Sequence, residues 1–171
     1  MRQSFTLIEL VVSIFIILLT LGGVFSLLVQ TIRATSDLPD QLIANYLAQE
    51  GIEIVRNIRD ANWIEGQEWD AGLTGCNSNC TGCDCSDGCA GSYYNMTLDG
   101  YPNVPLHLDG NGYYAQTTIG EETPFKRRIV INPETDSDGN DYLQVRVFVC
   151  WQRRGKNYQT ELDENLYNWG P

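Results

Sequence analysis

The sequence predicts an α+β fold in which a long, kinked N-terminal α-helix packs on a small antiparallel β-sheet. Three features indicate this fold: an apolar run near the N-terminus, a second stretch with helical spacing of apolar residues, and alternating β-prone segments near the C-terminus. About 140 residues follow the apolar run, enough for one globular domain with its own core. The expected segments are residues 1–4, 5–29, 30–63, 64–112 and 113–171.

Residues 5–29 have the length and polarity of a membrane-spanning helix. They follow a short leader, residues 1–4, and Glu9 is their only charged residue. At about 1.5 Å per residue the helix would measure about 37 Å, more than the roughly 30 Å hydrocarbon core of a bilayer. Because Arg2 precedes the run, we expect the N-terminus in the cytoplasm and the rest of the chain outside.

Glu9 is the informative residue of this run. A carboxylate inside an apolar span costs roughly 2.5–3.5 kcal/mol at membrane depth, and less near the interface. It therefore needs a cationic partner, and the neighbouring sequence supplies none. A free α-amino group on an adjacent chain would provide the charge if the leader were removed before Phe5.

Phe5-Thr6-Leu7-Ile8-Glu9, after a short basic leader, resembles the processing signal of type IV pilins and type II secretion pseudopilins. The resemblance implies that a prepilin peptidase cuts between Ser4 and Phe5 and N-methylates Phe5. It also implies that Glu9 pairs with the N-terminal amine of an adjacent subunit. Ser4 stands where the family usually has glycine, and both residues are small. An ordinary signal peptide would have an apolar region of only about 7–15 residues.

The same resemblance implies the fold, location and partners of the chain. The fold would be the pilin fold, and the protein would be a structural subunit, not an enzyme. The precursor would cross the cytoplasmic (inner) membrane once and then join an extracellular filament. Its partners would be other pilin subunits, the prepilin peptidase and the inner-membrane assembly platform. Residues 48–60 and 147–169 resemble minor-pilin-like proteins, which favours a minor pilin and leaves pilus and secretion pseudopilus open.

Residues 40–62 are predicted to continue the helix beyond the membrane. Their apolar residues recur in steps of four and three and so form one stripe, which should lie against the head. The stripe consists of Ile43, Leu47, Gly51, Ile54 and Ile58. Before it, residues 36–39 predict a break or kink, because Pro39 suits the first turn of a new helix.

The remaining chain is predicted to contain a long loop region followed by strands. Residues 64–112 are rich in turn-forming residues and show little periodicity. Strands are predicted at residues 113–119, 125–131, 142–152 and 158–162, with a turn at 154–157. In the third strand, alternate positions hold valines on one face and Phe148 and Cys150 on the other. The valine face should pack on the long helix.

The six cysteines are Cys76, Cys80, Cys83, Cys85, Cys89 and Cys150. In an exported protein, disulfides are the preferred interpretation, and six thiols allow fifteen connectivities. A metal site is the alternative, because four thiolates could hold zinc and Cys80 and Cys83 have ligand-like spacing. If Cys150 bonds to the cysteine-rich loop, that loop must cover the outer face of the sheet, over Phe148.

Residues 136–141 contain a weak candidate calcium site formed by Asp136, Asp138, Asn140 and Asp141. The closing glutamate of an EF-hand is absent, so an acidic hairpin turn is preferred, and no other cofactor is expected. His107 is the only histidine and lies in a predicted loop far from any nucleophile motif, which disfavours a hydrolase.

The composition excludes some classes of partner and leaves a second functional hypothesis. A net charge of −11 argues against binding to nucleic acid, which requires a basic face. The alternative function is a monomeric, membrane-anchored extracytoplasmic domain that binds a metal or ligand with its cysteine loop. Nine tyrosines and four tryptophans are compatible with a sugar- or surface-binding patch, although sheet and core positions are preferred for them.

Overall fold

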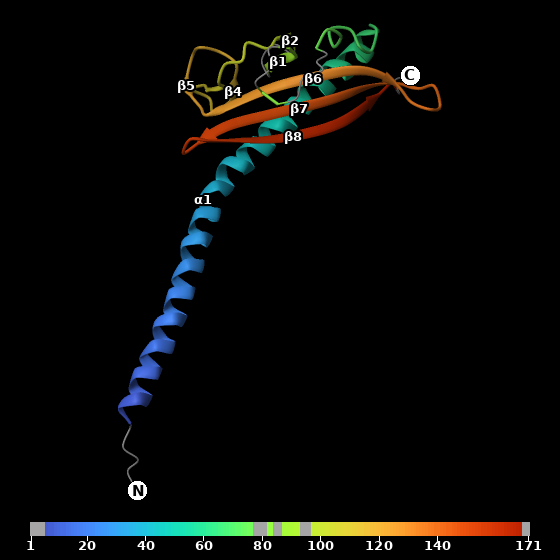
Figure 1. Cartoon of the computed structure of the whole chain (residues 1–171). Coiled ribbons are helices and arrows are strands. Elements are labelled where there is room, and N and C mark those ends of the chain that lie inside the picture. The colour runs from blue at the N-terminus through green and yellow to red at the C-terminus, as the bar shows by residue number, and fades with distance from the viewer. Residues whose placement is uncertain (1–5, 77–81, 84–86, 93–96, 169–171) are drawn as a thin grey trace. The chain divides into compact units, whose positions relative to one another are not determined.

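The computed structural model describes residues 6–76, 82–83, 87–92 and 97–168, and at positions 33, 34, 36 and 37 only the backbone. The chain divides into two compact units, residues 1–41 and 42–171. One helix, α1 (Leu7–Glu65), runs through both units, and the described part of the first unit is almost entirely this helix (Figure 1).

The helix α1 begins after Thr6 and continues through Pro39. The Thr6 hydroxyl accepts a hydrogen bond from the backbone N–H of Glu9 at 3.4 Å, which caps the first turn. The sequence predicted a break or a kink at residues 36–39; the break is wrong, because the helix is uninterrupted there, and the kink stays a prediction. A proline inside a helix costs about 3 kcal/mol and leaves a carbonyl without its donor. Here Pro39 is exposed, so that carbonyl can be hydrated, and helical sequence on both sides offsets the cost.

The helix α1 ends in a glycine-based cap. Gly66 has a φ of +70° and donates its N–H to the carbonyl of Trp63, while Gln67 donates to the carbonyl of Asn62. These two bonds define a Schellman motif, which requires a left-handed residue that glycine adopts readily. The Asn62 side chain donates to the carbonyls of Trp69 and Ala71 and so fixes the chain that follows.

The second unit contains a five-stranded antiparallel sheet in the order β2-β1-β6-β7-β8. Its strands are β1 (Cys89–Ser92), β2 (Thr97–Gly100), β6 (Phe125–Thr135), β7 (Asp141–Arg153) and β8 (Lys156–Tyr167). Figure 1 shows β6, β7 and β8 as three long neighbours. The sequence predicted these three, although shorter, and it predicted a loop where β1 and β2 lie. Arg154 and Gly155 have positive φ angles of 51° and 75°, as a two-residue hairpin turn requires.

A second, three-stranded sheet has the order β4-β3-β5. Its short strands are β3 (His107–Leu108), β4 (Tyr114–Ala115) and β5 (Glu121–Glu122). The strand predicted at residues 113–119 is therefore largely wrong. The Thr117 hydroxyl donates to the carbonyl of Ile119 and accepts from its N–H, a local turn that competes with strand pairing. His107 lies in a strand and is half-buried, whereas a loop position was predicted.

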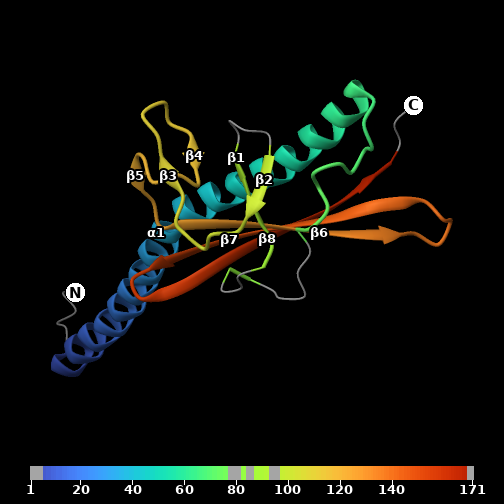
Figure 2. The same ribbon diagram turned by 90° about the horizontal axis from the view of Figure 1, so that it is seen from above.

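The core of the second unit lies between the C-terminal part of α1 and one face of the large sheet (Figure 2). Val145, Val147 and Val149 are fully buried on that face, which confirms the predicted packing of the valines on the helix. A Cβ atom at Gly51 would lie 2.7 Å from a methyl carbon of Val147. Helix and sheet therefore approach so closely at this position that only glycine fits without a shift.

Candidate functional site

The first candidate site is the apolar part of α1. Leu7–Ile32 is long and apolar enough to cross a membrane, and none of it is buried within the chain. A cleavable signal sequence would meet the same criteria of length and composition. Large side chains such as Phe15, Leu18 and Phe25 are each more than half exposed. The described chain thus offers no cover for this apolar surface.

Glu9 lies in the first turn of that surface and is exposed. Ion pairs between described residues do not include it. Thr6 and Glu9 occupy the positions of a capping box, a pattern that sequence reasoning missed although its four-residue spacing is visible. A carboxylate at this position also interacts favourably with the positive end of the helix dipole. Ser4 and Phe5, the predicted cleavage residues, lie outside the described part of the chain.

Four of the six cysteines form two disulfides. Cys76 bonds to Cys89, 13 positions later, and Cys83 bonds to Cys150, 67 positions later. The disulfide interpretation is therefore confirmed for these four residues, and Cys83 is not a zinc ligand here. Cys80 and Cys85 lie outside the described residues.

The Cys83–Cys150 disulfide holds the cysteine-rich segment on the outer face of the large sheet. Cys83, Val130 and Phe148 are buried together in a small second core, with the half-buried Cys150 packed against it. Phe148 has no exposed surface. The sequence-based inference that a bond to Cys150 places the cysteine-rich loop over Phe148 is thus confirmed.

Arg128 lies beneath this cover and is fully buried. Its guanidinium lies 4.9 Å from the centre of the Phe148 ring and donates to the carbonyl of Asp87 at 2.8 Å. Arg146 lies 5.8 Å from the same ring. Burial lowers the pKa of Arg128 from its ordinary value, because desolvation disfavours the charged form. The aromatic ring and the carbonyl offset part of that cost.

Arg127, the preceding residue, points to the opposite face and is also fully buried. It donates to the carbonyls of Leu47 and Gly91 at 3.2 and 3.0 Å, and it pairs with Glu50 at 3.1 Å. These contacts connect β6 to α1 and to β1. Sequence reasoning missed both arginines. Their positions in the strand could have indicated this burial. Consecutive residues of a strand face opposite sides of the sheet, so a strand covered on both faces buries both arginines.

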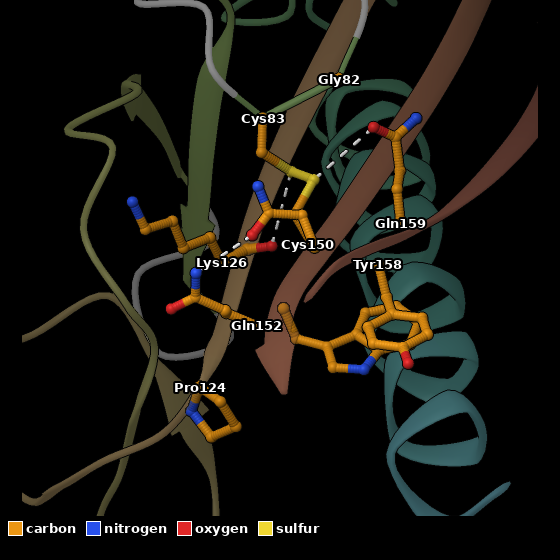
Figure 3. Close-up of a pocket in the computed structure, with 10 residues that line it drawn as sticks. Gly82, Cys83, Pro124, Lys126, Cys150, Gln152, Tyr158 and Gln159 are labelled. Atoms are coloured by element: carbon orange, nitrogen blue, oxygen red, sulfur yellow. Dashed lines mark hydrogen bonds between the residues drawn. A yellow bond between two sulfur atoms is a disulfide. The ribbon is translucent and has the colours of Figure 1, made fainter. Parts of the chain in front are cut away.

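A pocket of about 470 Å³ lies beside the Cys83–Cys150 disulfide (Figure 3). It is formed by the ends of β6, β7 and β8 together with Gly82 and Cys83, the described part of the cysteine-rich segment that covers this face of the sheet (the covering segment). Its lining residues are Gly82, Cys83, Pro124, Lys126, Cys150, Trp151, Gln152, Asn157, Tyr158 and Gln159. Trp151 and Tyr158 stack with ring centroids 5.5 Å apart, and Lys126 Nζ donates to Asn103 Oδ1 at 3.1 Å.

The candidate calcium segment forms a tight turn between β6 and β7. The Asp136 carboxylate accepts hydrogen bonds from the backbone N–H groups of Asp138 and Asn140 and from the Asn140 side chain. These bonds, that of the Asn140 backbone first, hold the pKa of Asp136 below its ordinary value. They stabilise the turn at neutral pH, and that stabilisation is lost as the pH falls through the lowered pKa. Asp141 accepts a hydrogen bond from the Thr135 hydroxyl.

The described residues contain no group of three or more histidine, cysteine or acidic side chains placed to hold a metal ion. The acidic segment has the geometry of the hairpin turn that the sequence favoured. Comparison with known proteins adds no assignment, because no family model, no curated protein and no solved structure matches this chain.

Proposed function

We propose that this protein is a pilin-like subunit, in the role of a minor pilin, that assembles into a type IV pilus or a related filament. The observation that carries the proposal is the uncovered apolar helix Leu7–Ile32 with a single acid, Glu9, in its first turn. That helix continues without interruption into a unit with its own core and disulfides. The resemblance of residues 5–9 to the pilin processing signal supports the same conclusion.

In this proposal the apolar helix has two environments in succession. It first spans the cytoplasmic membrane, where lipid covers its side chains, and then lies among the helices of other subunits in the filament. Cleavage after Ser4 creates the amine of Phe5. Glu9 of one subunit pairs with that amine on its neighbour, which fixes the axial register because an unpaired buried charge is costly.

The test is to replace Glu9 and measure incorporation into filaments. Glu9→Gln removes the charge but keeps a residue that suits the capping box, whereas Glu9→Ala removes both. We expect both variants to reach the membrane normally and to lose about tenfold or more of their incorporation, because the amine is left unpaired. Ser13→Ala is the control, since Ser13 only donates to the Glu9 carbonyl. Wild-type incorporation of Glu9→Gln would reject the pairing role.

The second candidate function is a membrane-anchored binding domain that never enters a filament. The pocket beside the Cys83–Cys150 disulfide favours it. Intact mass of the protein from its native membrane separates the two. A pilin-like subunit should lack residues 1–4 and carry one added methyl group, whereas an anchored monomer should keep the leader. The same measurement counts the disulfides through their missing hydrogens.

A further inference from the structure

The pocket beside the Cys83–Cys150 disulfide has a side-chain composition unlike the rest of the chain. The whole chain has 22 acidic and 11 basic residues, yet among the lining residues that the structure describes none is acidic. Three of them carry side-chain amides, Gln152, Asn157 and Gln159, and one is a lysine. All three amide residues are exposed.

Strand pairing fixes the positions of these amides. Gln152 lies opposite Asn157, and Cys150 lies opposite Gln159, on neighbouring strands β7 and β8. The Gln152 amide nitrogen donates to Asn157 Oδ1 at 3.3 Å. This bond leaves the Gln152 carbonyl oxygen and the Asn157 amide hydrogens for a ligand, so the pair presents an acceptor and donors together.

The third amide, Gln159, lies close to the disulfide and to Gly82. Gln159 Oε1 lies 3.7 Å from the Cys150 sulfur, and a Cβ atom at Gly82 would lie 2.8 Å from the same oxygen. Figure 3 shows Gln159 on one side of the disulfide and Lys126 and Gln152 on the other. Polar side chains therefore lie on both sides of the disulfide, on the same outer face of the sheet.

The pocket also has an apolar part. Pro124 and the disulfide supply it, whereas the side chains of Trp151 and Tyr158 stack on the helix-facing side of the sheet, where Trp151 belongs to the main core. A ligand that fits must therefore combine apolar surface with several groups that both donate and accept hydrogen bonds. A carboxylate ligand fits poorly, because Lys126 is the one cation among the described lining residues and already donates to Asn103.

We propose that this pocket binds carbohydrate, with Gln152, Asn157 and Gln159 bonding to sugar hydroxyls. A sugar ring has an apolar face and an edge of hydroxyls, each of which both donates and accepts. The volume of about 470 Å³ lies within the range of small-ligand sites and suits roughly one or two sugar rings. This inference is independent of filament assembly, because every group that it uses lies within residues 82–159.

The experiment is saturation-transfer NMR on the full chain in dodecylphosphocholine, since a maltoside or glucoside detergent would itself compete for the pocket. The probes are glucose, galactose, N-acetylglucosamine and maltose. We expect transfer to at least one of them, and we expect Gln152→Ala to weaken its binding about five- to tenfold, the usual effect of one lost hydrogen bond in a binding site. Gln159→Ala should weaken binding to a similar extent.

The matched control is Gln144→Ala. Gln144 lies on the same face of β7, eight positions from Gln152, and donates to Asp163 outside the pocket. Its replacement should leave sugar binding unchanged. The proposal is overturned if no probe shows transfer to the wild-type chain, or if Gln152→Ala and Gln159→Ala bind the active probe as tightly as Gln144→Ala does. Thermal unfolding of each variant identifies any that is misfolded, and the second amide variant then decides.

Discussion

The two units use the same helix in opposite ways. In the first unit, residues 1–41, Val24 is 56% exposed, and the large apolar side chains of Leu7–Ile32 are uncovered like it. In the second unit Val55 is fully buried against the sheet. The second unit therefore contains the partners that stabilise it, whereas the described residues provide no cover for the apolar surface of Leu7–Ile32.

Charged residues follow the same division. Glu9 and Glu50 both lie on α1, and Glu50 has a buried partner, Arg127, at 3.1 Å. The described residues provide no such partner for Glu9. In the proposed function, Glu9 finds its partner on another subunit, whereas Glu50 has its partner within the chain. This contrast gives three predictions about stability, in order of decreasing effect.

Removal of the long-range disulfide should have the largest effect on the second unit. Cys83→Ala combined with Cys150→Ala should lower the free energy of unfolding by about 4 kcal/mol, because this bond closes a long loop in the unfolded chain. The measurement is urea unfolding of the full chain in detergent, followed by tryptophan fluorescence.

The comparison variant combines Cys76→Ala with Cys89→Ala, whose bond spans only 13 positions. It should cost about 3 kcal/mol on the same chain-entropy argument. The prediction that matters is the order of the two losses in unfolding free energy. The Cys83–Cys150 bond should give the larger loss, because it closes the longer loop and also keeps Phe148 and Arg128 out of water. If the Cys83 and Cys150 variant lost less unfolding free energy than the Cys76 and Cys89 variant, the covering segment would stay in place without its disulfide.

The part of the fold that the sequence predicted is the part with a regular period. The stripe of residues 43–58 and the alternation in residues 142–152 each define a face, so helix, strands and their packing follow from spacing alone. The covering of Phe148 was also predictable, because Cys150 lies on the face opposite the valines. Strands β1 and β2 pair with each other, but each is only four residues long, too short to show a period, and only the pair Cys89 and Ile129 joins them to β6, so they were not predicted.

The candidate sites also divide into those that a sequence pattern reveals and those that only the folded structure reveals. Glu9 was found because a lone acid in an apolar run stands out in the sequence. The pocket was not found, because Gln152, Asn157 and Gln159 are ordinary exposed strand residues until the hairpin sets them side by side. The burial of Arg127 and Arg128 likewise depends on what covers each face of β6, which residue type alone does not reveal.

Loss of the ion pair between Glu50 and Arg127 should have the second largest effect. Glu50→Ala leaves the fully buried guanidinium of Arg127 without its counterion, and we expect a cost of about 3 kcal/mol. Glu53→Ala is the matched control on the same helix, three positions away. Glu53 pairs with Arg56 in a partly exposed setting, so its loss should cost less than about 1 kcal/mol. Equal losses in urea unfolding would show that burial of Arg127 does not depend on Glu50.

The smallest expected effect tests the comparison of the two units most directly. Val55→Ala should cost about 2 kcal/mol, because it removes two methyl groups from a fully packed position. Val24→Ala makes the same chemical change on the same helix at a position without packing partners in the chain, and it should change the free energy of unfolding by less than about 0.5 kcal/mol. Helix propensity changes equally in both variants, so the difference between them isolates packing. A loss at Val24 as large as that at Val55 would mean that the chain itself packs against this position, which would contradict the proposed burial of this helix among other subunits.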